Sequence, residues 1–82
     1  MDAIVRTPEQ LAQALRAQRT RKKLTQGSAG KNVGLLPKTI SGLEKTPERS
    51  SVASLFRLLS ALDLELVVRA KTADQDASGT EW

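Results

Sequence analysis

Residues 24–44 read LTQGSAGKNVGLLPKTISGLE, and this stretch decides the fold of the chain. Thr25 can cap a short helix that begins at Gln26, because its hydroxyl can accept a hydrogen bond from a free backbone N–H at the helix start. Gly34 marks a sharp turn, since glycine tolerates the left-handed backbone that a helix end often requires. Pro37 suits the first position of a second helix, where its missing N–H is no loss. The stretch predicts two short helices joined by a tight turn.

The second helix of this pair has an inward and an outward side. Ile40 and Leu43 are three residues apart, so both can pack inward. Gly30, in the first helix, is expected where the two helices cross closely. A helix held in this way can enter the major groove of DNA and contact base edges with its exposed side chains. The residues expected to contact DNA from this helix and its end are Lys38, Thr39, Ser41 and Lys45.

Two further groups are candidates for contacts with the DNA backbone. Gln26 stands at a helix N-terminus, where it can bind a phosphate and support the second helix. A basic cluster precedes the motif, and it can line the backbone or simply form a solvated helix end that complements the helix dipole. Its members are Arg16, Arg19, Arg21, Lys22 and Lys23, of which the last three are the expected contacts.

The stretch resembles the Xre family of lambda-repressor-like helix-turn-helix proteins. The matching residues are Leu24, Thr25, Gln26, Gly34, Thr39, Ile40, Ser41 and Glu44. More narrowly, TPEQLAQALRAQR before the motif, SVASLFRLLSALDLELVVRAK after it and a polar end with Trp82 are similar to HipB-like antitoxins of HipA/HipB systems. The resemblance implies a homodimer that binds a palindromic operator, represses its own operon and neutralises a HipA-like Ser/Thr kinase toxin.

The chain departs from the family pattern at four positions. Ala29 and Gly30 stand where Leu and Ala are usual, and Gly27 replaces a better helix former. Because an interior Gly costs about 1 kcal/mol relative to Ala, the helix from Gln26 to Val33 is expected to depend on tertiary packing. Leu36 stands where a Ser-like cap or a polar DNA contact is common, so neither role is carried over to it.

Composition excludes several classes of function. The 82 residues include no Cys and no His, so common zinc, redox and nucleophilic sites cannot be built, and we expect no enzyme activity, no metal and no cofactor. The net charge is +4, and residues 1–50 hold ten Lys and Arg against four Asp and Glu. This basic half suits a polyanionic partner. No apolar run approaches the roughly 18 residues that cross a membrane, so we expect a cytoplasmic, nucleoid-associated protein.

Helices are also predicted on both sides of the motif. A first helix is expected from Pro8 to about Lys22, with Thr7, Pro8 and Gln10 forming a capping box. A fourth helix is expected after Ser50 or Ser51, because apolar residues recur there at helical spacing. These residues are Val52, Leu55, Phe56, Leu59 and Leu62, and Phe56 with its Leu neighbours is expected in the core. Residues 45–50, KTPERS, are expected to form a loop.

Residues 63–70 follow the alternating pattern of a half-buried strand. A single strand cannot satisfy its own hydrogen bonds, so its partner is either residues 3–6 or the same strand of a second chain, which we favour. Leu64, Leu66 and Val68 would then form the dimer contact. A core of this size rarely supplies more than about 3–5 kcal/mol, which also favours dimerisation. Residues 72–82 are expected to be a disordered tail.

Trp82 has two interpretations. It is either a solvated chain end or an anchor that docks in a partner pocket, and docking is favoured because Trp is enriched at binding hot spots.

The sequence thus predicts an all-α, lambda-repressor-like helix-turn-helix bundle of four to five helices. One C-terminal β-strand pairs across a homodimer, and a disordered tail follows. The DNA-binding and dimerisation domain is residues 1–71, with the motif at 25–45. The expected function is an autorepressor and antitoxin. The alternatives are a stand-alone Xre-type repressor without a toxin, or a protein-interaction adaptor that no longer reads DNA.

Overall fold

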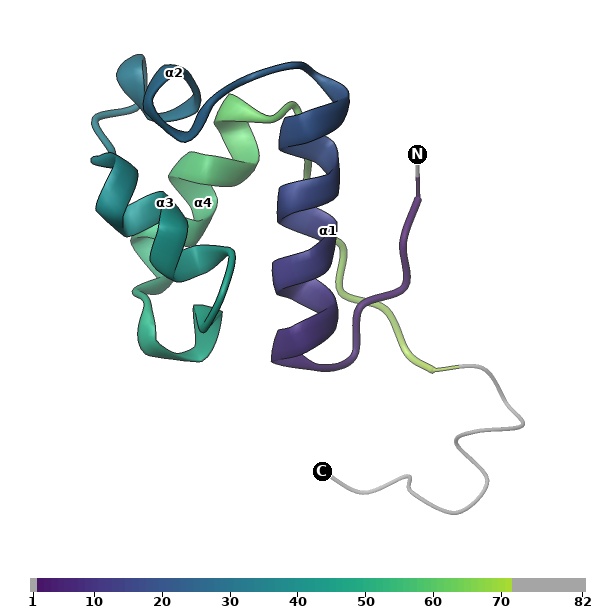
Figure 1. The fold of residues 1–82 in the computed structure, drawn as a ribbon. Helices are drawn as coiled ribbons and strands as arrows, with labels where there is room; N and C mark the ends of the chain where they lie inside the picture. The colour runs from purple at the N-terminus through teal and green to yellow at the C-terminus, as the bar shows by residue number, and fades with distance from the viewer. Residues whose placement is uncertain (1, 72–82) are drawn as a thin grey trace.

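The computed structural model describes residues 2–71, and four α-helices and one 3-10 helix lie in that range (Figure 1). The predicted tail and Trp82 lie outside the described residues. No helix of the described part is long and apolar enough to cross a membrane. The elements are α1 (Pro8–Arg21), α2 (Gln26–Lys31), α3 (Pro37–Leu43), η1 (Pro47–Arg49) and α4 (Val52–Ala61).

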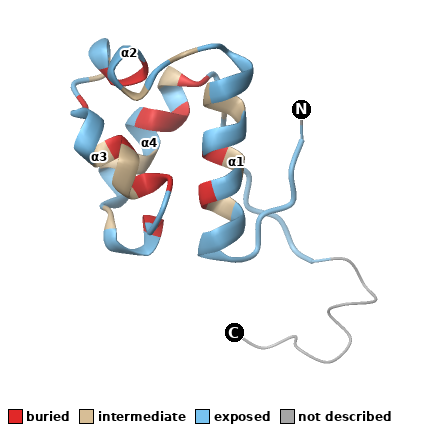
Figure 2. Cartoon of the chain, in the orientation of Figure 1, coloured by how far each residue is buried: buried red, intermediate tan, exposed pale blue. Residues whose placement is uncertain are grey.

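The helices surround one small aliphatic core. In Figure 1, α4 lies between α1 and the α2–α3 pair, and Figure 2 shows the buried residues on the sides of the helices that face one another. Burial of these side chains removes apolar surface from water and is the main favourable contribution to folding. The predicted all-α bundle is confirmed. Its core consists of Leu15, Ala29, Leu35, Ile40, Leu43, Leu58, Leu59 and Leu62.

Local sequence signals set where the helices begin. The Thr7 hydroxyl caps α1 by accepting a hydrogen bond from the Gln10 N–H (3.1 Å), as predicted. The reciprocal half of the predicted capping box is wrong, because the Gln10 side chain accepts from the Arg6 N–H instead (2.5 Å). Ser51, one of the two predicted caps of α4, accepts from the Ser54 N–H.

Helices α1 and α4 end in the same way. The residue after each C-cap, Lys23 and Asp63, has a left-handed backbone, with φ of 60° and 57°. The next N–H donates back into the last turn, from Leu24 to the Arg19 carbonyl (3.1 Å) and from Leu64 to the Leu59 carbonyl (2.8 Å). Both ends are therefore Schellman motifs built without glycine.

Side chains tie these two helix ends together. The Gln18 side-chain amide donates to the Leu62 carbonyl (3.0 Å), which satisfies a free carbonyl at the end of α4. The Lys22 ammonium pairs with the Asp63 carboxylate, with 2.6 Å between Nζ and Oδ2. The ends of α1 and α4 are consequently held side by side.

Phe56 corrects the prediction for α4. It was expected in the core, but its exposed fraction is 50%, and that of Val52 is 67%. A helix turns about 100° per residue, so Phe56 lies a quarter-turn from Leu55 and off the stripe that Leu58 and Leu62 complete. The buried residues of α4, Leu58 and Leu59, thus lie in its second half.

The segment after α4 differs in part from the predicted strand 63–70. Asp63 belongs to the helix end, so an extended segment starts no earlier than Leu64. Residues 64–71 have no regular secondary structure in this chain, which leaves pairing with a second chain as a prediction. Leu64 packs against the core of its own chain, whereas Leu66 and Val68 are exposed.

Candidate nucleic-acid interface

The turn between α2 and α3 depends on two glycines. Gly34 has a φ of 73°, a left-handed conformation that glycine adopts without strain. The Leu35 N–H then donates back to the Gly30 carbonyl (3.1 Å). A Cβ on Gly30 would collide with the Leu35 carbonyl oxygen and with Cδ1 of Ile40. The predicted close crossing at Gly30 is confirmed.

Helix α3 separates its side chains between two faces. Ile40 and Leu43 are almost fully buried, with exposed fractions of 0% and 1%, and they fasten α3 to the core. Lys38 is exposed on the other side, and the helix contains no acidic residue. Lys38 thus lies on the outward side, as predicted. Thr39 and Ser41 are partly exposed, and Lys45 is exposed just beyond the helix.

Glu44, the C-cap of α3, is the charged residue of the core, with an exposed fraction of 3%. Arg19 of α1 donates two hydrogen bonds to this carboxylate, from Nε to Oε2 at 2.6 Å and from Nη2 to Oε1 at 2.9 Å. This pairing raises the pKa of the Arg19 guanidinium, through its hydrogen bonds to Glu44. Arg19 also donates through Nη1 to the Leu24 carbonyl at 2.8 Å, so one side chain joins α1, the loop before α2 and the end of α3.

Gln26 lies at the start of α2 and joins the same network. Its side-chain amide donates to Oε1 of Glu44 at 3.3 Å. Thr25 caps the helix in a full capping box with Ser28, each side chain accepting the other residue's backbone N–H. Gln26 therefore contacts the C-cap of α3, in line with its predicted role of supporting that helix.

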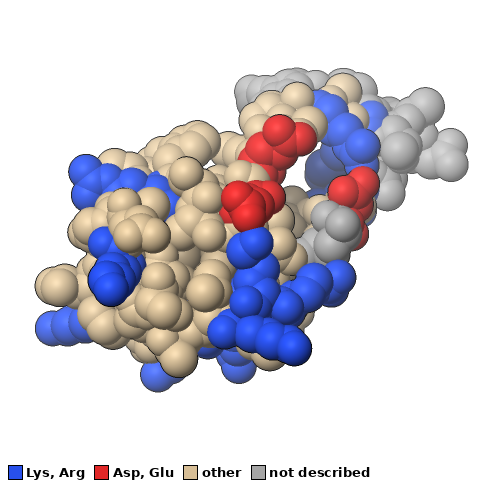
Figure 3. All heavy atoms as spheres, turned by 90° about the horizontal axis from the view of Figure 1, so that it is seen from above, with Lys and Arg blue, Asp and Glu red and all other residues tan. Residues whose placement is uncertain are grey.

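The basic residues at the end of α1 differ in their partners. Arg21, Lys22 and Lys23 are exposed, but Lys22 is paired with Asp63 of the α4 end. Figure 3, which views the molecule from above, shows one large group of Lys and Arg beside acidic side chains and smaller groups elsewhere on the same face. The Lys22 ammonium is thus held at the end of α4 in this structure.

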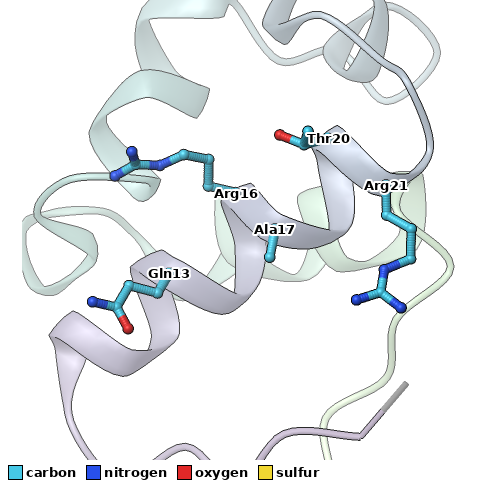
Figure 4. A pocket seen from close by; sticks show the side chains of 5 residues that line it. All are labelled: Gln13, Arg16, Ala17, Thr20 and Arg21. Carbon is cyan, nitrogen blue, oxygen red and sulfur yellow. The ribbon is translucent and has the colours of Figure 1, made fainter.

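The outer face of α1 carries a shallow, open depression. It is lined by Gln13, Arg16, Ala17, Thr20 and Arg21, all from α1 itself. Figure 4 shows the Arg16 and Arg21 side chains pointing away from each other across it. Two cations that diverge in this way do not converge on one ligand, so the depression is no binding pocket.

Sequence reasoning missed two features of this site. The Arg19–Glu44 pair joins residues far apart in the chain, and no local pattern indicates such a pairing. Leu36, the N-cap of α3, has an exposed fraction of 70%, which its apolar side chain alone does not suggest.

Comparison with known proteins places the chain in a family. No protein-family model matches it. Antitoxin HipB of Escherichia coli O6:H1 strain CFT073 is 32% identical to the chain, over 93% of the chain and 85% of the antitoxin. Antitoxin HipB of Escherichia coli strain K12 is 30% identical, over 93% of the chain and 91% of the antitoxin. The chain belongs to the HipB antitoxin family.

Solved structures agree with this HipB assignment. The chain superposes on HipB from a HipB–O4 20mer complex with a TM-score of 0.81 and 27% identity, covering 87% of this chain and all of that one. It superposes equally on a chain of a HipA–HipB–O2–O3 complex, with a TM-score of 0.81, 27% identity and the same coverage. The recognition of a HipB-like antitoxin from sequence is confirmed.

Proposed function

We propose that this chain is a DNA-binding antitoxin that dimerises, represses its own operon from a palindromic operator and neutralises a HipA-like Ser/Thr kinase. Residues 1–71 would form the DNA-binding and dimerisation domain, and residues 72–82 would carry a partner contact at Trp82. HipB relatives found in complexes with an O4 20mer and with HipA support both activities.

One observation carries the DNA-binding part of this proposal. Helix α3 presents a face without carboxylates, while Ile40, Leu43 and Glu44 fix its opposite face to the rest of the domain. A rigidly held helix with polar and basic outward side chains has the form that major-groove readout requires. Lys38, Thr39 and Ser41 would reach base edges and nearby phosphates. In a dimer the two α3 helices would meet half-sites about 34–36 Å apart, or a multiple of that distance.

The remaining contacts would position the protein on the DNA backbone. Gln26 can donate the second N–H of its amide to a phosphate, and its amide oxygen can accept from a bridging water, while one N–H stays on Glu44. Arg21, Lys23 and Lys45 are exposed cations that can approach phosphates. Lys22 can do so only by leaving Asp63, which costs little because this pair is exposed.

Affinity for the chain's own promoter fragment tests this function. We expect Lys38→Ala to weaken binding or to relax sequence discrimination, and affinity to fall steeply as salt rises. Arg57→Ala is the matched control, because it removes the same charge from an exposed position of α4 outside the core stripe. If the chain binds its promoter no better than random DNA, operator recognition is wrong. An equal loss in both variants would assign the effect to net charge.

The toxin contact is tested in the full chain. We expect affinity capture from the native lysate to retain a kinase, identified by mass, and Trp82→Ala to weaken that retention. Loss of a buried Trp at an interface centre typically costs about 2 kcal/mol or more, which corresponds to a thirtyfold loss of affinity. If Trp82→Ala retains the kinase as well as the unaltered chain, Trp82 is not the anchor. If neither retains a kinase, the chain is a repressor without a toxin partner.

A further inference from the structure

Leu36 occupies an unusual place for a large apolar side chain. It is the N-cap of α3, and its exposed fraction of 70% is larger than that of Phe56 or Val52 in α4. It makes no side-chain hydrogen bond to the start of the helix. Leu36 is therefore the most exposed large hydrophobic side chain of residues 24–44, and it lies at the start of the helix that the proposed function places in the major groove.

This placement costs the domain stability. A Ser, Thr, Asn or Asp at an N-cap position stabilises a helix by roughly 0.5–2 kcal/mol relative to an apolar residue. Helix α3 has only seven residues and no acidic residue in its first turn, so Pro37 at its first position is its remaining local start signal. Core packing of the Leu36 side chain does not offset this loss of stability, since the side chain is mostly exposed to water.

Gly27 lies beside the start of α3. The neighbouring first turn of α2 carries Gly27, whose Cβ would come within 4.0 Å of Cγ of Pro37. A longer side chain at Gly27 would thus rise beside the start of α3. Because glycine has no side chain, nothing projects from position 27 beside the start of α3. Lys38 is exposed in the first turn of α3. The tip of α3 is open, apolar at one residue and basic two residues later.

We propose that Leu36 is a specificity residue that recognises the C5-methyl group of a thymine in each operator half-site. This inference rests on the proposed function. The first residues of a recognition helix lie nearest the base edges in the major groove. Thymine alone presents a methyl group there, and an apolar side chain is the partner that such a group selects. Lys38 would anchor an adjacent phosphate or guanine and hold Leu36 against the base.

A coupling experiment between Leu36 and single thymines tests the proposal. Footprinting of the full chain on its promoter fragment defines the protected site. Duplexes are then prepared in which each thymine of that site is replaced, one at a time, by deoxyuridine, which keeps all hydrogen bonds and lacks only the methyl. Affinities are measured for the unaltered chain, Leu36→Ala, Leu36→Ser and Val52→Ala. The last is the control, an exposed apolar residue on α4.

We expect one thymine in each half-site to matter to the unaltered chain. Its replacement lowers affinity about fourfold, the effect of one methyl group left without an apolar contact. Leu36→Ala and Leu36→Ser bind the original site more weakly and no longer distinguish thymine from uracil at that position. Leu36→Ser keeps or raises the melting temperature, because it restores a cap. Val52→Ala distinguishes the two bases as the unaltered chain does.

Two results would overturn the inference in different ways. If the chain discriminates its operator but every thymine replacement affects Leu36→Ala as much as the unaltered chain, Leu36 does not contact a methyl group and the proposed function stands. If the unaltered chain binds its promoter no better than random DNA, the proposed function fails and this inference fails with it.

Discussion

The Arg19 guanidinium donates two hydrogen bonds to the Glu44 carboxylate, with N···O distances of 2.6 and 2.9 Å. This pair links the end of α1 to the end of α3. Paired charges with little exposure are strongly coupled, because removal of one partner leaves the other charge buried and unsatisfied. The exposed fractions of the two side chains are 16% and 3%. The position of α3 thus depends on a residue of α1.

Arg19→Met should lower the free energy of unfolding by about 3 kcal/mol, because it leaves the Glu44 carboxylate without its main partner. Urea denaturation measures this change. The double variant Arg19→Met/Glu44→Leu should recover most of the loss, since it removes both charges and adds apolar packing. A double variant as unstable as the single one would show that the two residues do not act as a pair.

Gly30→Ala should destabilise the domain by about 2–3 kcal/mol, because its Cβ would strike the Leu35 backbone, which cannot move without opening the turn. Gly42→Ala is the matched control in α3, where the nearest atom to a new Cβ is Oγ of Ser50 at 3.7 Å. That change should be neutral or stabilising by up to about 1 kcal/mol. Equal effects of the two substitutions in thermal denaturation would contradict the close crossing.

Asp63→Gly should be more stable than Asp63→Ala by about 1 kcal/mol. Both remove the ion pair with Lys22, but only glycine relieves the left-handed backbone at φ 57°. The comparison isolates the backbone term, and urea denaturation measures it. Identical midpoints and slopes for the two variants would mean that this helix end is not left-handed in solution.

Leu66→Lys should shift the chain from dimer to monomer in sedimentation at micromolar concentration, if residues 64–70 pair with their copy as we propose. Neighbouring residues of a strand point to opposite faces, so Val67→Lys is the control on the other face. Both side chains are exposed in the single chain, at 54% and 66%, so neither change disturbs its core. Unchanged sedimentation of Leu66→Lys would exclude this contact.

Stability should be nearly constant between about pH 6 and pH 9. The chain has no His and no Cys, the side chains that ordinarily titrate in or near this range. The pairing with Glu44 raises the folded-state pKa of Arg19, so its contribution is fully present below the unfolded-state pKa and is lost only as the pH rises through the folded one. Both lie far above this window. A change of more than about 1 kcal/mol across it would require another titrating group.

The sequence predicted those parts of the fold whose causes are local. The Thr25 cap, the Gly34 turn and the Pro37 helix start each act within a few residues, and all three occur as expected. The outward positions of Lys38, Thr39 and Ser41 followed from the inward pair of Ile40 and Leu43.

Other features depend on distant parts of the chain or on a second chain. The ion pair of Arg19 spans 25 positions, and no spacing rule connects them. The apolar spacing of α4 predicted Phe56 in the core and did not include Leu58, whereas in the folded chain Leu58 is buried and Phe56 is half exposed. The predicted strand would find its hydrogen-bond partner in a second chain. The structure of one chain therefore does not test this pairing.

The division of α3 into an inward face with Glu44 and an outward face with Leu36, Lys38, Thr39 and Ser41 has an evolutionary consequence. Substitutions on the outward face change the exposed surface of α3 and leave its contacts with the core intact. With α3 reading the operator as we propose, a lineage of such antitoxins can drift to new operators one outward residue at a time, while Ile40, Leu43 and Glu44 preserve the framework. The same separation makes this seven-residue helix a convenient cassette for redirecting a repressor by design.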